Sequence, residues 1–286
     1  MSQKEETKGE EKRKLLSPKL DVIFQALFGE VGSERITKKF LEAILDEELE
    51  EVDLSRNIVL KRENLEDKMG ILDVLVKINN EEYCNVEMQM VEKDKLLERI
   101  LYYWSRIYGK NLKSSNDYVE LKKTIEVLIV NFEIKKLEEL EYHSKWKIIE
   151  EKKRKLVLTE DLEIHIIEMP KIYKLAGEEQ DEELVKWLEF IENPESKKVE
   201  KYMKENKEMK EAKEKLEVMS EDERMQILAE LREKAIRDEK AVERYGYKQG
   251  REKGIKEIAK KMKDNGIEIE IIQKITNLTQ EEIEAL

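Results

Sequence analysis

Two short apolar runs on either side of a polar turn constrain the possible folds of this chain more than any other stretch does. Residues 70–91 have the sequence GILDVLVKINNEEYCNVEMQMV, and the turn is at residues 79–81. Val and Ile favour strands, and an Asn-rich turn between two such runs is typical of a hairpin. Alternate residues along a strand point to opposite faces of a sheet. The stretch therefore predicts an antiparallel hairpin with Asp73, Glu87 and Gln89 on one face.

The register of this hairpin sets two acids against each other. With residues 79–81 as the loop, Ile78 pairs with Glu82, and counting back places Asp73 directly across from Glu87. Opposed residues have Cβ atoms roughly 4.5–5.5 Å apart, and like charges at that spacing destabilise a sheet. A divalent cation with oxygen ligands is the natural partner of such a pair. The alternative is an ordinary polar face, and a loop of different length would separate the two acids.

An acid on one strand, followed on the next by Glu87-x-Gln89, resembles the core motif of PD-(D/E)XK nucleases. From about Ser17 to its end, the chain resembles PD-(D/E)XK family transposases, or Rpn-type recombination-promoting nucleases. The resemblance implies an α/β fold: a restriction-endonuclease-like core, with a mixed central sheet flanked by helices, and an α-helical C-terminal extension. The blocks that carry it are SPKLDVIFQALFG, GILDVLVKI, NVEMQM, ERILYYWSRIYGKNL, NDYVELKKTIEVLIVNF and RYGYKQGREKGIKEIAKKM.

The resemblance also implies roles for the residues of the hairpin. Asp73 and Glu87 would bind Mg²⁺ or Mn²⁺, with the backbone carbonyl of Met88 as a further ligand. Gln89 stands where the motif usually has Lys, and this branch of the family commonly carries Gln there. A Gln side chain orients a water molecule by hydrogen bonding but supplies no charge.

An acid in the first predicted helix is implied in the same site. In the resembling family an Asp at the place of Asp21 reaches the active site, so Asp21 is a catalytic candidate. An acid in the first turn of a helix is also favourable to the helix dipole, and that alternative stays open. Four positions later the family usually has Lys, whereas this chain has Gln25.

Four further residues are candidates for DNA contacts. Arg and Tyr side chains hold phosphates by hydrogen bonds. Each candidate has a structural alternative, because exposed basic residues are often only solvated and residues of a long helix can cover the sheet. The candidates are Arg62, Arg99, Tyr103 and Arg106.

The function that the resemblance implies is hydrolysis of DNA by a metal-dependent endonuclease that promotes recombination or is linked to mobile elements. A net charge of −12 counts against DNA as the partner, because an acidic chain binds polyanions poorly without local basic patches. The charge and Gln89 keep an alternative open, a catalytically inactive nuclease-fold protein that acts as an interaction scaffold. RNA as the substrate also stays open.

The order of expected elements agrees with a mixed sheet. A first helix is expected to open with Ser17 as its cap and Pro18 in its first turn and to end at Gly29. Apolar periodicity predicts two further helices at 33–45 and 92–112. Strands are expected at 57–62, at 124–132, where the run is nearly continuously apolar, and at about 142–150 and 162–169. The strand after the helix at 92–112 must run parallel to the second strand of the hairpin, because the helix is a crossover.

We expect four regions along the chain. They are a disordered leader at 1–16, the nuclease-like core at 17–176, a helical extension at 177–244, and a tail at 245–286. Within the extension, one charged helix is expected at 197–218, and a capping box at Ser220 starts another that ends near Arg244.

The tail begins with a joint containing Gly246, Gly250 and Gly254 and continues as three short helices that resemble a helix-turn-helix. Its last helix is acidic and would repel phosphate. We therefore favour packing or homo-oligomerisation through the C-terminal helices over base recognition.

Residue counts exclude several other classes. Cys84 is the one cysteine, so no disulfide can form within the chain, and a reducing cytoplasmic location is expected. The apolar runs are too short to span a membrane. His143 and His165 are not in a zinc-like spacing.

Overall fold

The computed structural model describes residues 14–54, 73–79, 81–110, 112, 117–177 and 182–286. The predicted strand at 57–62 therefore lies outside the described residues. The chain divides into two compact units, Met1–Glu233 and Lys234–Leu286. Helix α7 (Glu223–Asp264) begins in the first unit and ends in the second.

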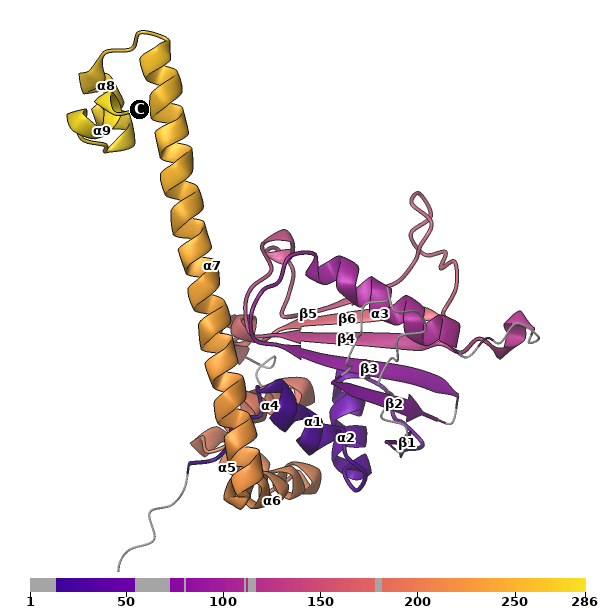
Figure 1. Cartoon of the computed structure of the whole chain (residues 1–286). Helices are drawn as coiled ribbons and strands as arrows, with labels where there is room; N and C mark the ends of the chain where they lie inside the picture. The colour runs from indigo at the N-terminus through magenta and orange to yellow at the C-terminus, as the bar shows by residue number, and fades with distance from the viewer. Residues whose placement is uncertain (1–13, 55–72, 80, 111, 113–116, 178–181) are drawn as a thin grey trace, which may run out of the picture. The chain divides into compact units, whose positions relative to one another are not determined.

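A mixed sheet forms the centre of the first unit, and its order in the described part of the chain is β1-β2-β3-β4-β6-β5 (Figure 1). Strand β3 is antiparallel to β2 and parallel to β4, and β4 is parallel to β6. The outer strands β1 and β5 are antiparallel to their neighbours. The strands are β1 (Val52–Asp53), β2 (Val74–Ile78), β3 (Glu82–Gln89), β4 (Thr124–Val130), β5 (His143–Trp146) and β6 (Leu162–Glu168).

The hairpin has the register that the sequence predicts. Ile78 pairs with Glu82, and the pairing continues to Val74 and Val86. Asn79 adopts the left-handed conformation, with φ of 49°, which Asn tolerates better than most residues. The crossover from β3 to β4 through α3 (Leu96–Lys110) makes the β3–β4 pair parallel, as predicted.

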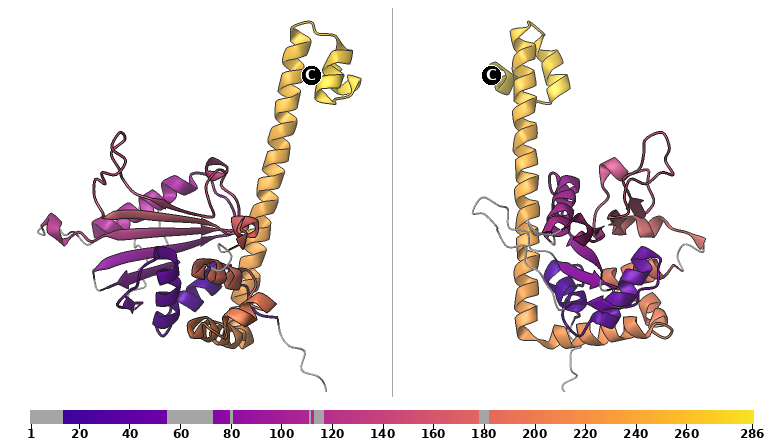
Figure 2. Two further views of the ribbon diagram at one scale, coloured as in Figure 1. Left: turned by 180° about the vertical axis from the view of Figure 1, so that it is seen from behind. Right: turned by 90° about the vertical axis from the view of Figure 1, so that its right-hand side faces the viewer.

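Helices lie on both faces of this sheet (Figures 1 and 2). Helix α3 covers one face, where Leu96 and Ile100 join a buried cluster with Leu128 and Ile164. On the other face are α1 (Asp21–Phe28), α2 (Glu34–Leu45) and α4 (Glu183–Glu192). Helix α1 begins at Asp21 with Leu20 at its N-cap position, so the start predicted at Ser17 and Pro18 is wrong. The buried aromatic rings of these three helices contact one another, and these are Phe24, Phe28, Phe40, Trp187 and Phe190. The resulting layers are those of an α/β fold with a PD-(D/E)XK-like core and a helical extension.

The extension corrects two predictions. The single helix predicted at 197–218 is two helices, α5 (Lys197–Tyr202) and α6 (Lys207–Glu221), because Asn206 caps a new start by accepting from the Met209 amide at 2.8 Å. The capping box predicted at Ser220 is wrong. Its hydroxyl donates to the Leu216 carbonyl, and Asp222 instead accepts from the first amides of α7.

The predicted glycine joint is helical. Gly246, Gly250 and Gly254 all lie inside α7, which does not end near residue 244 as predicted. Each internal Gly costs a helix about 1 kcal/mol relative to Ala. The Lys, Arg, Glu and Gln residues between them are good helix formers, and this offsets the cost.

The second unit contains the end of α7, α8 (Ile269–Thr276) and α9 (Gln280–Glu284) around a buried core of Ala259, Ile272 and Ile283. The capping box predicted at the start of α9 is confirmed. The Glu282 amide donates to Thr279 Oγ1 at 3.2 Å, and the Thr279 amide donates to Glu282 Oε2 at 2.8 Å. Short 3-10 helices elsewhere are η1 (Tyr118–Glu120), η2 (Lys135–Leu137) and η3 (Met169–Lys174).

Among the described helices, none combines the length and the apolar composition that crossing a membrane needs.

Candidate active site

Asp73 and Glu87 lie together where the hairpin ladder ends. The last paired residues of β2 and β3 are Val74 and Val86, and one further step in this register places Asp73 across from Glu87. The Met88 amide donates to Asp73 Oδ2 at 2.7 Å. The Asp73 side chain therefore takes over the place where the next ladder bond would form.

The two acids share surroundings that disfavour negative charge. Burial and the neighbouring Glu87 carboxylate raise the pKa of Asp73 to about 8, against the hydrogen bond from Met88. Burial also raises the pKa of Glu87, against the hydrogen bond from Asn85 Nδ2 at 3.4 Å and the nearby Arg99. Both environments therefore favour the protonated form of these carboxyl groups.

A third acid, Glu126, lies close to this pair on the central strand β4. It is fully buried, and Asn85 Nδ2 donates to its Oε1 at 2.8 Å. Burial and the Glu87 carboxylate raise the pKa of Glu126 well above its usual value. Among the described residues, Glu126 Oε2 and Asn85 Oδ1 have no hydrogen-bond partner.

Glu126 was not among the site residues predicted from the sequence. The run TIEVLIVNF at residues 124–132 predicts an apolar strand, and the Glu inside it was the available signal of a polar site. Because charged residues are rarely fully buried unless they are paired, a Glu in a central strand marks a polar site beneath the helix that covers it.

The backbone of β3 adds an oxygen on the side of Asp73. In a strand, the amide and carbonyl of one residue point to the same neighbour, and successive residues alternate. The Tyr83 amide and the Gln89 carbonyl form bonds with residues flanking β4, namely Lys123 and Asn131. The Met88 amide bonds to Asp73, so the Met88 carbonyl also faces the side of Asp73.

This donor set fits a hard divalent cation. Two carboxylates whose charge is disfavoured, together with one backbone carbonyl, offer the oxygen ligands that Mg²⁺ and Mn²⁺ prefer. Mg²⁺ typically takes one or two carboxylates and keeps several waters. The described residues contain no group of three or more Asp, Glu, His or Cys that could hold a metal ion.

Asp21 lies beside the pair, in the first turn of α1, and its charge raises the pKa of both Asp73 and Glu87. Its own partner is Arg232 of α7. Arg232 Nε donates to Asp21 Oδ1 at 2.7 Å, and Nη2 lies 2.6 Å from Oδ2. Nothing in the sequence indicates that Arg232 would reach this acid.

The four residues that were predicted to contact DNA differ in where they lie relative to the acid pair. Arg99 lies near enough to Glu87 to lower its pKa, and its guanidinium carbon is 5.9 Å from the centre of the Tyr103 ring. Burial raises the pKa of Tyr103, as does the charge of Glu87. Arg106 lies about two turns after Arg99 on the same helix. Arg62 lies outside the described residues.

Two family models match the chain. Residues 18–246 match the model described as PD-(D/E)XK nuclease family transposase, a span of well over half the chain. The chain belongs to this family. Residues 252–286 of this PD-(D/E)XK protein match the model described as Rpn/YhgA-like nuclease family, C-terminal HTH domain, which agrees with the predicted helix-turn-helix character of the tail. No curated protein and no solved structure matches the chain.

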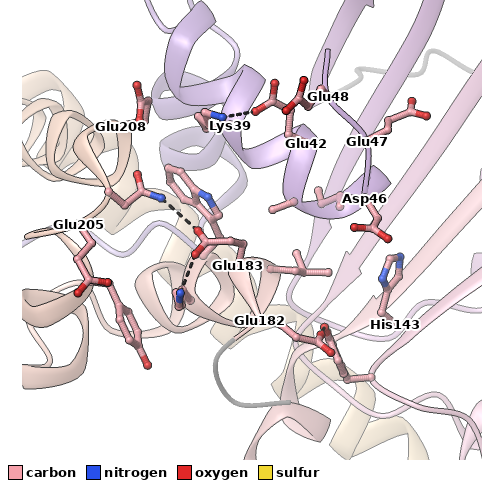
Figure 3. Close-up of a pocket in the computed structure, with 18 residues that line it drawn as sticks. Lys39, Glu42, Asp46, Glu47, Glu48, His143, Glu182, Glu183, Glu205 and Glu208 are labelled. Atoms are coloured by element: carbon pink, nitrogen blue, oxygen red, sulfur yellow. Dashed lines mark hydrogen bonds and ion pairs between the residues drawn. The ribbon is translucent and has the colours of Figure 1, made fainter. Parts of the chain in front are cut away.

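The PD-(D/E)XK core also contains a pocket of about 820 Å³ that is separate from the acid pair (Figure 3). It lies among α2, α4, α6 and the start of β5, and none of the predicted site residues lines it. Its charged lining is mostly acidic, with Glu42, Asp46, Glu183 and Glu208 among the labelled side chains. A negative lining repels phosphate, so this pocket is not a site for a nucleic-acid backbone.

Proposed function

We propose that this nuclease-family protein is a cation-dependent DNA endonuclease that hydrolyses phosphodiester bonds at Asp73 and Glu87. The observation that carries the proposal is the register of β2 and β3, which opposes the half-buried Asp73 to the buried Glu87, together with the Met88 amide that donates to Asp73. An uncompensated pair of this kind is costly to bury unless a positive partner joins it.

Each residue of the site has a task in this proposal. Asp73, Glu87 and the Met88 carbonyl would hold the cation, and a proton held by the two acids would pass to the solvent when the cation binds. Mg²⁺ or Mn²⁺ would lower the pKa of a bound water and stabilise charge on the leaving oxygen. Gln89, at the end of β3, orients the attacking water through its side-chain amide.

Substrate binding falls to the positive groups near the pair. Arg99 and Tyr103 lie on α3 beside Glu87, and we propose that they contact the phosphate next to the scissile bond. DNA as the substrate, and a role in recombination or mobile elements, are supported by the family description and by the C-terminal HTH match. A net charge of −12 implies that binding depends on such local contacts.

Plasmid cleavage tests the proposal directly. Purified protein with Mg²⁺ or Mn²⁺ at low salt should nick or linearise supercoiled DNA, and Asp73→Asn and Glu87→Gln should each abolish this. Glu163→Gln is a matched control, because it removes a buried acid from β6 of the same sheet. Wild-type protein inactive with both ions, or normal cleavage by both acid-pair variants, would refute the catalytic assignment.

The alternative function is a nuclease-fold scaffold without catalysis, and Gln89 favours it because the usual cationic side chain is missing from the motif. Calorimetry separates the two functions without measuring activity. Titration with Mn²⁺ should show one saturable site that Asp73→Asn removes. It should also release protons at pH 7, seen as a dependence of the heat on the buffer. A scaffold should show neither.

A further inference from the structure

The strongest unassigned feature near the acid pair is a positive charge that comes from the far end of the first unit. Arg232 lies on α7, 211 residues after its partner Asp21. Asp21 lies in the first turn of α1 beside the acid pair, so its ion pair with Arg232 brings a positive charge to the edge of that site. The nuclease motif itself supplies no cation in this chain, because Gln89 is neutral.

We infer that Arg232 is a substrate-binding residue of the nuclease site, where it contacts a phosphate of the bound DNA strand. This inference rests on the proposed function, since it assigns a residue to the same site. It extends the site to a helix that lies outside the hairpin and α3.

The geometry leaves Arg232 able to make this contact. Its Nε and Nη2 atoms bind the two oxygens of Asp21 in a fork, which uses one edge of the planar guanidinium. The remaining N–H donors of a guanidinium point away from such an edge. The Arg232 side chain is 34% exposed, so part of it is open to solvent, from which a strand can approach.

Asp21 has a positioning role in this arrangement. Its carboxylate is fixed at the start of α1, where the Val22 amide also donates to Oδ1 at 2.9 Å. A guanidinium held by such a fork has lost most of its rotamer freedom before DNA arrives, which lowers the entropy cost of binding a phosphate. The bound Arg232 also offsets the charge of Asp21, which would otherwise repel the strand.

The competing explanation is that the Asp21–Arg232 pair only holds α7 against α1. The two explanations predict different results when Asp21→Asn is compared with Asp21→Asn/Arg232→Gln. Neither of these proteins carries the charge of Asp21. If Arg232 contacts phosphate, Arg232→Gln weakens DNA binding even in an Asp21→Asn background. If the pair only joins two helices, Asp21→Asn has already broken it, and the second substitution changes nothing.

The experiment measures binding of a labelled DNA duplex to the full chain in Ca²⁺, which is expected to support binding without efficient cleavage. The Asp21→Asn/Arg232→Gln protein should bind about tenfold more weakly than Asp21→Asn, as expected when a hydrogen bond to a charged group is lost. Arg224→Gln removes the same charge from an exposed position of α7 and should change affinity much less. Arg232→Lys should lie between wild type and Arg232→Gln.

Three results would overturn the inference. They are equal affinities of Asp21→Asn and the double variant, equal losses from Arg224→Gln and Arg232→Gln, and a wild-type protein that binds no DNA. Equal melting temperatures of Asp21→Asn and the double variant are required for the comparison, and Arg232→Lys replaces Arg232→Gln in it if they differ. Cleavage that persists while affinity is unchanged would refute the role of Arg232 and leave the proposed function standing. If Arg232→Gln loses affinity but the wild-type protein never cleaves DNA, the role of Arg232 stands and the proposed function is refuted.

Discussion

Glu87 on β3 and Glu163 on β6 are buried acids of the same sheet with opposite electrostatic surroundings. Each residue is 3% exposed. Lys145 Nζ lies 2.6 Å from Glu163, and His165 Nε2 lies 2.8 Å from it. Glu87 instead has an amide, Asn85 Nδ2, at 3.4 Å and a second acid, Asp73, across the strand pair.

The pKa values diverge accordingly. Burial alone would raise the pKa of Glu163, but the hydrogen bonds from His165 and Lys145 outweigh burial and lower it. The pKa of Glu87 is raised. Two equally buried acids can therefore have different roles. An acid that the chain itself neutralises belongs to the framework. An acid whose charge stays disfavoured, as that of Glu87 does despite Asn85 and Arg99, is suited to a cation from outside.

The largest expected effect is on cleavage. Glu87→Gln should reduce cation-dependent plasmid cleavage by more than the roughly 10–100-fold that loss of a supporting partner costs a metal site. Glu163→Gln should leave the rate near that of the wild type, because Glu163 lies among its own cations. Initial rates at saturating Mn²⁺ measure both. Equal losses in the two variants would end the distinction between the acids.

Stability should show the reverse order. Glu163→Gln removes the partner of Lys145 and His165 and should lower the free energy of unfolding by about 2–3 kcal/mol. This is below the roughly 3–5 kcal/mol of a fully buried pair, because Lys145 reaches water. Glu87→Gln should be neutral or stabilising in EDTA, since it removes a disfavoured charge. Urea denaturation at pH 7 gives both values, and a strongly destabilised Glu87→Gln protein would contradict the contrast.

The dependence of stability on pH should have opposite signs for Asp73 and Glu163. Asp73 has a pKa of about 8 when folded and an ordinary value near 3.8 when unfolded. Between these values the folded state holds a proton that the unfolded state has lost, so its contribution to stability falls as pH rises toward 8. The lowered pKa of Glu163 gives stability that is present above its ordinary value of 4.5 and is lost at lower pH.

From pH 6.5 to 8, comparison with Asp73→Asn separates the Asp73 effect from those of the other acids with raised pKa values, Glu87 and Glu126. Burial lowers the pKa of His143 to about 4, so its contribution changes mainly below pH 6.5. Wild-type protein in EDTA should lose stability across this range, and Asp73→Asn should lose less. Saturating Mn²⁺ should remove the difference in slope. A wild-type slope that matches the Asp73→Asn slope in EDTA would mean that Asp73 is ionised without a cation.

The smallest expected effect comes from Gln89→Lys. A lysine at the end of β3 would place a positive charge near the acid pair, which lowers the pKa of Asp73 and weakens cation binding a few-fold by competition. Cleavage at saturating Mn²⁺ should change no more than a few-fold. Calorimetry and initial rates measure the two quantities. An unchanged cation affinity would mean that residue 89 does not face the pair.

The hairpin could be predicted from sequence because its register depends on local features. The apolar alternation and the turn at residues 79–81 together fix which residues oppose each other, and Asp73 and Glu87 follow from them. The parallel pairing of β3 with β4 followed from the crossover helix in the same way.

Arg232 and Glu126 could not be predicted, for different reasons. Arg232 reaches Asp21 only through the folding of the whole first unit, and no local pattern encodes a contact across 211 residues. Glu126 is visible in the sequence as a Glu within an apolar run, but its link to the acid pair runs through Asn85 of the neighbouring strand. Capping was predicted correctly at Thr279 and wrongly at Ser220, where a nearby Asp222 provided a competing cap.

Asn79 holds the turn of the hairpin by two hydrogen bonds, one through its side chain and one through its backbone amide. Its side-chain oxygen accepts from the Glu50 amide at 2.7 Å, and its own amide donates to the Glu51 carbonyl at 3.1 Å. A one-residue insertion or deletion there would act on the fold as a frameshift acts on a gene, because every later residue of β3 would keep its identity and exchange its face. Relatives that retain this chemistry should therefore vary the letters of the turn while preserving its length.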